Sequence, residues 1–166
     1  MTGVQTCALP ICNSAVANLF GIESSNIVTI AGVKALNSTA APTEGDALKY
    51  ANEALRKDDR LAKAYFIKGF VYKETKDTAN AISSFQTVVE LDPDNYDAYI
   101  LLGNIFSKRG NPIALQYFGD ALRIRPSSTE AFYNRGLFLQ DAGKLDAAVA
   151  DYTTLLKLDP GYSDAH

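Results

Sequence analysis

Apolar residues recur along the second half of this chain with the three-and-four spacing of amphipathic helices, and the whole pattern returns about every 34 residues. Short polar stretches that contain Gly, Asn or Pro interrupt it at regular points, as turns between helices do. Two helices therefore fit into each period. The expected pairs are 61–75 with 78–91, 95–109 with 112–124, and 128–142 with 145–158.

Six positions in each period carry the same kind of residue. They are Tyr65, Gly69, Tyr72, Ala81, Phe85 and Pro93, then Tyr99, Gly103, Phe106, Ala114, Phe118 and Pro126, then Phe132, Gly136, Leu139, Ala148, Tyr152 and Pro160. The step from Gly69 to Gly103 is 34 residues and the step from Ala81 to Ala114 is 33, so one residue is missing near Asn111. A deletion confined to a turn leaves both flanking helices intact, which indicates that the repeating unit is a helix pair.

Three of these positions are glycines inside a predicted helix, where glycine costs about 1 kcal/mol relative to alanine. We expect Gly69, Gly103 and Gly136 to lie where the second helix of each pair approaches closely. The small residues expected opposite them are Ala81, Ala114 and Ala148, with the aromatic rings closing over the contact.

This arrangement resembles the tetratricopeptide repeat, a helix-turn-helix unit of about 34 residues. The resemblance extends from about Leu61 to Gly161. The chain contains no Trp, and Tyr65, Tyr99 and Phe132 occupy the position where the family pattern has it. The resemblance implies an all-α, right-handed solenoid in which helix pairs stack side by side.

The repeats set the expected organisation of the chain. They are 62–95, 96–128 and 129–162, preceded by a degenerate repeat at 28–61 and followed by the start of a truncated one at 163–166, so that the array occupies 28–166. The second helix of the degenerate repeat is its clearer half, because Thr43 and Asp46 form an N-terminal cap. Its apolar residues Ala47, Leu48, Ala51, Ala54 and Leu55 share one face.

The N-terminal segment has a different character. Residues 1–12, which begin MTGVQTCALPI, resemble a translated sequencing adapter, and we interpret them as a non-native leader; 13–27 is irregular. Cys7 and Cys12 are then uninformative, and no further Cys or nearby His completes a metal site or a disulfide framework. Because the native N-terminus is expected to be missing, cytoplasm and bacterial periplasm both remain open.

Composition excludes several functions. A net charge of -3 and a pI of about 5.1 disfavour binding to nucleic acid, which requires a basic surface. No apolar run reaches the length of about 18 residues that a membrane-spanning helix needs. The only His is His166, and neither a nucleophile paired with a base nor a phosphate-binding loop is present, so we expect no catalysis, no cofactor and no metal.

The family resemblance implies a binding surface, because first helices of such pairs line a concave groove that commonly holds a partner peptide or protein. The groove residues expected here are Lys63, Phe66, Phe70 and Lys73, then Asp97, Ile100, Asn104 and Ser107, then Glu130, Tyr133, Leu137 and Gln140. Exposed apolar residues of this kind often mark a binding site. In the alternative interpretation, internal packing or absent repeats cover Phe66, Phe70, Ile100, Tyr133 and Leu137.

One sub-class of the family clamps the carboxylate tail of chaperones with basic residues and asparagines. Asn104 matches one such asparagine, but Phe66, Ile100 and Tyr133 stand where a clamping lysine is expected. This departure argues against a clamp in this chain.

We therefore expect a protein-interaction scaffold without catalytic activity. Two alternatives stay open: a regulatory or assembly module of a longer protein, such as an enzyme or a membrane-anchored lipoprotein, and a self-associating array. Because the repeat pattern stops in mid-unit, we also expect helix 145–158 to present an uncovered face that self-associates or frays.

Overall fold

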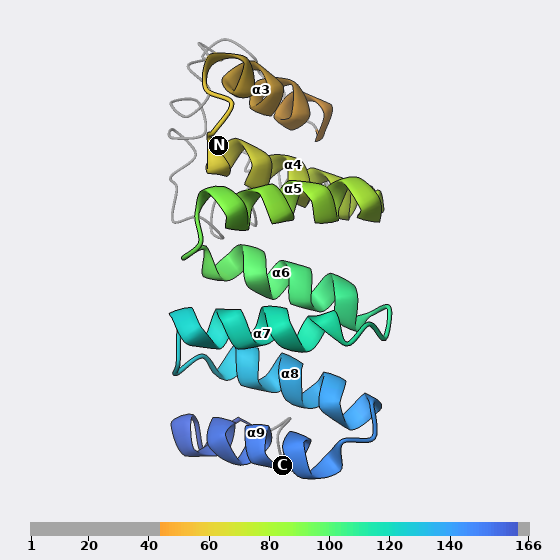
Figure 1. Ribbon diagram of the computed structural model, residues 1–166, viewed down its shortest axis with the longest axis vertical. Coiled ribbons are helices and arrows are strands. Elements are labelled where there is room, and N and C mark those ends of the chain that lie inside the picture. Colours follow the sequence, from red (N-terminus) through yellow and green to blue (C-terminus); the bar gives the residue numbers. More distant parts are fainter. Residues whose placement is uncertain (1–43, 163–166) are drawn as a thin grey trace, which may run out of the picture. The chain divides into compact units, whose positions relative to one another are not determined.

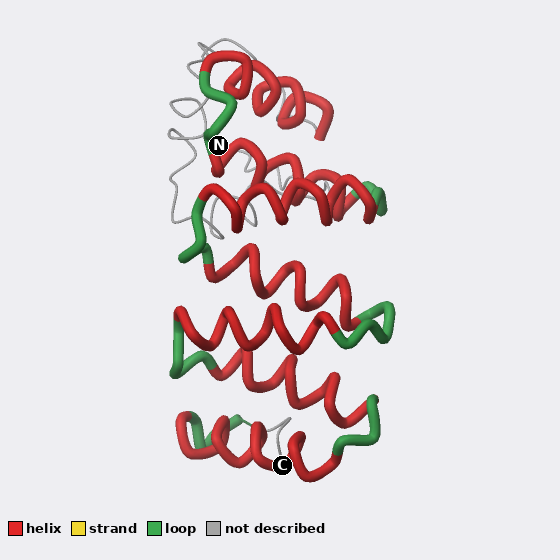
Figure 2. Tube along the Cα trace, in the orientation of Figure 1, coloured by secondary structure: helices red, strands yellow, loops and turns green. Residues whose placement is uncertain are grey.

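The computed structural model describes residues 44–162, and all regular structure in that range is α-helical, with no strand (Figures 1 and 2). The helices are α3 (Glu44–Lys57), α4 (Ala62–Glu74), α5 (Thr78–Leu91), α6 (Tyr96–Ser107), α7 (Ile113–Ile124), α8 (Thr129–Asp141) and α9 (Leu145–Leu158). The bounds of the six helices predicted in pairs agree with these within two residues, and the all-α class is confirmed.

Several sequence-based expectations fall outside the described residues. They concern the adapter-like leader 1–12, the irregular segment 13–27, the first half of the degenerate repeat 28–61, and the start of a further repeat at 163–166. Within 44–162 the chain splits between two compact units, one ending at Asp59 and the other beginning at Arg60.

The first unit contributes α3, at the place predicted for the second helix of the degenerate repeat. Ala51 and Ala54 are buried on one side of it, and Ala47, Leu48 and Leu55 are partly buried. The apolar face predicted for this helix is therefore present.

In the second unit, consecutive helices pack as three pairs, α4 with α5, α6 with α7 and α8 with α9 (Figure 1). The pairs are joined by contacts of α5 with α6 and of α7 with α8, and the first helices α6 and α8 also touch each other. Each pair thus buries its apolar face against the next pair, as a solenoid requires.

Glycines form the closest contact inside each pair. A Cβ atom added to Gly69 would lie 2.7 Å from the ring of Phe85, one on Gly103 would lie 2.5 Å from Phe118, and one on Gly136 would lie 2.7 Å from Tyr152. The atoms nearest each glycine therefore belong to the aromatic ring of the second helix. The second helix of each pair therefore does approach the glycine of the first helix closely, as predicted, and it does so through an aromatic ring.

The turns inside the three pairs share one geometry. Lys76, Gly110 and Gly143 have φ values of 63°, 62° and 73°, in the left-handed region. In each turn the next amide N–H donates to a carbonyl five residues earlier, for example from Asp77 to Tyr72 at 2.8 Å. This is the Schellman arrangement, which ends a helix by pairing its last carbonyls.

Side-chain caps begin several of the helices. Asp77 caps α5, Asn95 caps α6 and Ser128 caps α8, each accepting a hydrogen bond from the amide three residues later. In the turn shortened by one residue, the Asn111 side chain accepts from the Ile113 amide at 3.0 Å. The deletion is thus absorbed at the start of α7, as the repeat spacing predicts.

Candidate protein-interaction surface

The predicted groove residues all lie on the first helices α4, α6 and α8 of the second unit. Ten of the twelve are exposed or half-buried. Phe66 and Ile100 are the exceptions, with 3% and 4% of their surface exposed. Phe66 lies edge-on to the ring of Phe85, at 5.5 Å between centroids, and Ile100 belongs to the hydrophobic core around Phe118. Neither offers contact area to a partner.

The α4 part of this surface is basic and aromatic. Lys63 is exposed, and Phe70 is half-buried beneath the ammonium of Lys73, which lies 4.9 Å from the ring centroid. Lys73 also forms an ion pair with Glu74. The aliphatic stem and the charge of Lys73 are therefore held next to an aromatic ring, where both can meet a ligand.

The α6 part is polar. Asp97, Asn104 and Ser107 are half-buried along it, at the register positions that α4 fills with Lys63, Phe70 and Lys73. The surface thus changes from basic to acidic between corresponding positions of neighbouring repeats.

The α8 part is the most apolar. Leu137 is 41% exposed, and the Tyr133 ring lies 6.3 Å from that of Tyr152 and 5.4 Å from that of Tyr162. The Tyr152 hydroxyl donates a hydrogen bond to Oε1 of Gln140 at 3.1 Å. This link and the ring contacts hold the side chains of the α8 surface in place.

Tyr152 and Tyr162 were not among the predicted surface residues. Repeat register gives a signal for Tyr162, because it occupies the position of the capping residues Asn95 and Ser128 without being able to cap. A large ring at such a position must lie on a neighbouring surface, and it lies on Tyr133.

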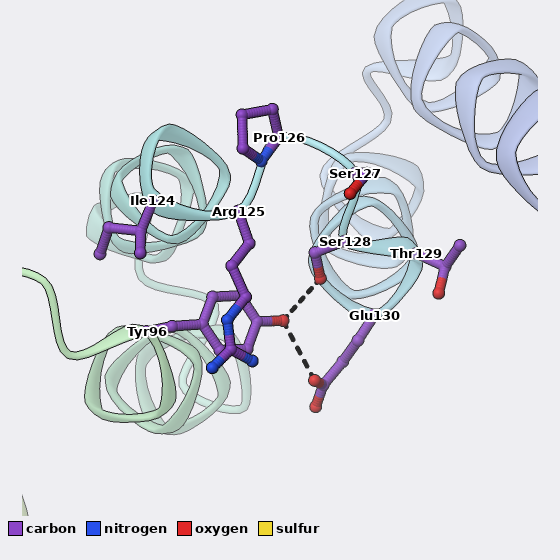
Figure 3. Close-up of a pocket in the computed structure, with 8 residues that line it drawn as sticks. All are labelled: Tyr96, Ile124, Arg125, Pro126, Ser127, Ser128, Thr129 and Glu130. Carbon is purple, nitrogen blue, oxygen red and sulfur yellow. Dashed lines mark hydrogen bonds between the residues drawn. The ribbon is translucent and has the colours of Figure 1, made fainter.

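Glu130 is tied to the preceding repeat through Tyr96. The Tyr96 hydroxyl lies 2.6 Å from the Ser128 hydroxyl and donates to Oε2 of Glu130 at 3.1 Å (Figure 3). The guanidinium of Arg125 lies across the Tyr96 ring, 4.0 Å from its centroid. Burial raises the pKa of Tyr96 to about 12, so the hydroxyl keeps its proton and can donate up to a higher pH than an exposed tyrosine can.

These residues line an open depression where the loop after α7 enters α8 (Figure 3). Its lining residues are Tyr96, Ile124, Arg125, Pro126, Ser127, Ser128, Thr129 and Glu130. The contact between Tyr96 and Glu130 spans one full repeat, and the sequence pattern gave no signal for it.

Across residues 44–162, no group of three or more His, Cys, Asp or Glu side chains is arranged to hold a metal ion. None of the helices in the same range is both long enough and apolar enough to cross a membrane.

Stacked antiparallel helix pairs with matched residues exposed on their first helices define a helical-repeat protein of the α-solenoid class. Sequence models of the tetratricopeptide repeat match residues 62–95, 84–115 and 129–162. The chain belongs to the tetratricopeptide repeat family. Such repeats serve as protein-interaction modules, and the fold is generally a non-catalytic scaffold.

Known proteins match part of this chain in sequence. DnaJ homolog subfamily C member 3 of Homo sapiens is 34% identical over 87 residues, which are 52% of this chain and 17% of that protein. The chain thus spans about a sixth of the length of this relative.

Solved structures of known proteins share the fold of this chain. MamA superposes with a TM-score of 0.66 at 24% identity, covering 73% of this chain and 67% of its own. YrrB, described as a tetratricopeptide repeat protein with an unusual peptide-binding site, superposes with a TM-score of 0.68 at 25% identity, covering 93% of this chain and 78% of its own.

Proposed function

We propose that this chain binds a peptide segment of a partner protein on the surface formed by α4, α6 and α8, and that it acts by binding alone. The observation that carries the proposal is the matched exposure of first-helix residues in three successive repeats. The contact residues are Lys63, Phe70, Lys73, Asp97, Asn104, Ser107, Glu130, Tyr133, Leu137 and Gln140. Phe66 and Ile100 leave the predicted set because they are buried.

The chemistry of this surface favours a ligand with mixed character. Phe70, Tyr133 and Leu137 offer apolar contact area, and aromatic residues are the side chains most often found at the energetic centre of an interface. Asn104 and Gln140 offer amide groups that can pair with a peptide backbone. A peptide whose apolar side chains alternate with polar ones fits this combination.

Charge gives the ligand a preferred direction. Lys63 and Lys73 favour an acidic stretch over α4, whereas Asp97 and Glu130 favour a basic stretch over the first turns of α6 and α8. Since these charges lie at the surface, they guide approach and orientation more than they add affinity, and salt weakens them.

One solved structure supports peptide binding, and the residues of this chain argue against one particular kind of it. The peptide-binding site of YrrB belongs to a protein that shares this fold over most of the chain, and it supports peptide binding as the general function. The chaperone-tail clamp receives no support, because Phe66, Ile100 and Tyr133 occupy the positions expected for its basic residues.

Selection from a displayed random-peptide library, followed by affinity measurement on the enriched peptides, tests the proposal. We expect Phe70→Asp and Tyr133→Asp each to weaken binding on the order of tenfold or more, because each puts an unpaired charge into an apolar contact. Ile113→Asp is the matched control, since Ile113 is 45% exposed on the second helix α7. Binding that survives both first-helix substitutions would contradict the proposal, and so would a control variant that weakens binding as much as they do.

A second candidate is a module within a longer protein. It is favoured by the match to DnaJ homolog subfamily C member 3, in which the matched segment makes up only 17% of the length. The uninterrupted reading frame in the source genome tests it: an enzyme or membrane-anchored domain in the same frame supports this role, and a frame that encodes repeats alone refutes it.

A further inference from the structure

One face of α9 is apolar and largely exposed, whereas the corresponding faces of the other second helices are partly buried. Leu145 and Val149 are 61% and 62% exposed. By repeat register Val149 corresponds to Leu115 of α7, and Leu156 corresponds to Leu122. Leu115 and Leu122 are partly buried against a core that includes residues of α8. In α9 the same positions are also apolar, and the Val149 side chain is exposed to solvent.

The apolar residues on this face begin and end with a leucine, and the charges at the two ends have opposite signs. Leu145, Val149 and Leu156 are four and seven positions apart, so they form one stripe along the helix. Exposed charges flank the stripe on the same edge, with Asp146 in the first turn and Lys157 in the last. Reading the helix backwards therefore gives the same order of apolar residues with the opposite order of charge.

We propose that this face binds a second copy of the chain, with α9 antiparallel to α9 of the other molecule across a two-fold axis. Leu145 of each copy then lies beside Leu156 of the other, and the two Val149 side chains lie near the axis. Asp146 of each copy faces Lys157 of the other, which gives two equivalent ion pairs. A two-fold contact of this kind uses the same patch on both molecules and closes on itself.

The charges select this arrangement over its parallel counterpart. In a parallel pair the two-fold axis would run along the helices, so the edges that carry Asp146 and Lys157 would lie on opposite sides of the contact and neither ion pair could form. The antiparallel pair also sets the positive end of each helix dipole beside the negative end of the other. Since one helix pair is small compared with a standard interface, the dimer should be weak and dependent on concentration.

Sedimentation equilibrium of the full 166-residue chain over a range of concentrations tests this inference. We expect the mass to rise from one copy to two, and Val149→Asp to weaken dimerisation on the order of tenfold or more. Val149 is exposed, so the variant should keep its helix content by circular dichroism. Leu137→Asp is the control, because Leu137 is an exposed leucine on α8 and should leave the dimer unchanged.

Charge reversal tests the direction of the pair. Asp146→Lys and Lys157→Asp should each weaken the dimer, and the double variant should restore it, because the two ion pairs reform with exchanged partners. A monomer at all concentrations overturns the proposal. So does a dimer that Val149→Asp leaves intact, or one that Leu137→Asp disrupts instead, which would assign association to the first-helix surface.

Discussion

At the residue scale, the glycines at the closest helix contacts show how a locally unfavourable choice stabilises the pair. Gly103 has a lower helix propensity than alanine would have. Its missing side chain leaves the space that the ring of Phe118 occupies. Phe118 is fully buried, so its ring has no room to yield. At Gly119, on the neighbouring helix, an added Cβ would meet no atom within 4 Å, which offers a direct comparison.

The same substitution at these two glycines should therefore have opposite effects. Gly103→Ala should lower the free energy of unfolding by about 1–2 kcal/mol, because overpacking outweighs the gain in propensity. Gly119→Ala should raise it by about 0.5–1 kcal/mol, because the chain gains propensity without a clash. Denaturant unfolding measures both, and equal effects would refute the packing role of Gly103.

Backbone conformation gives a second comparison at this scale. Lys76 adopts the left-handed region that Gly110 and Gly143 occupy in the other two turns, and a side chain there is strained by about 1 kcal/mol or more. We expect Lys76→Gly to raise the melting temperature and Gly110→Lys to lower it. A drop in melting temperature for Lys76→Gly would show that contacts of the lysine outweigh the strain.

At the element scale, the sequence was sufficient to predict the helices but insufficient for parts of the surface. Turn residues, caps and the 34-residue register locate helices α4 to α9, because these signals are local. Burial of Phe66 and Ile100 entered only as an alternative for the whole apolar set, since both share a register position with the half-buried Tyr133. Which of three equivalent side chains reaches solvent depends on neighbouring rings, and a linear pattern does not contain that information.

An ion pair in the third repeat shows how packing between two helices depends on sequence context. Arg135 of α8 donates two hydrogen bonds to the buried carboxylate of Asp151 on α9, at 2.7 and 2.6 Å. Hydrogen bonding to Asp151 raises the pKa of Arg135, so the arginine stays charged. The second repeat has Leu102 and Tyr117 at the corresponding positions, so the repeat pattern does not require an ion pair there.

Removing one partner of this pair should therefore cost more than removing both. Arg135→Leu leaves the Asp151 carboxylate buried without its partner and should lower the free energy of unfolding by about 3 kcal/mol. The double variant Arg135→Leu with Asp151→Tyr reproduces the second repeat and should recover most of that loss. Chemical denaturation of the variants decides the matter, and additive effects would contradict this expectation.

Tyr96 joins the second and third repeats, and its ionisation should weaken that link. Its folded-state pKa, about 12, lies above the ordinary value of 10, so its contribution is fully present below pH 10. As the pH rises from 10 towards 12, the unfolded state releases the proton first and stability falls.

Unfolding measurements across this pH window test the link. Burial also raises the pKa values of Tyr99 and Tyr152, so these residues add to the slope in the same direction. We expect Tyr96→Phe to make the loss of stability between pH 10 and 12 shallower without abolishing it. A variant with the same slope as the original chain would show that Tyr96 does not contribute to it.

At the scale of the whole molecule, different faces are proposed to serve different partners. The first helices α4, α6 and α8 present side chains to a peptide, and the outward face of α9 presents an apolar stripe to a second copy. The sequence predicted the first surface through family resemblance and the second through the uncovered helix. Neither the ring cluster on Tyr133 nor the link from Tyr96 to Glu130 was foreseen, because both depend on how adjacent repeats pack.

Binding of a partner peptide along the first helices of successive repeats is the proposal on which the function of this chain depends. A nuclear magnetic resonance titration of the labelled chain with a library-selected peptide is the decisive experiment, because it reports every residue at once. We predict the largest shift changes at the exposed residues of α4, α6 and α8, including Phe70, Asn104 and Tyr133. Changes concentrated on the outward faces of α5, α7 or α9 would contradict peptide binding on the first helices.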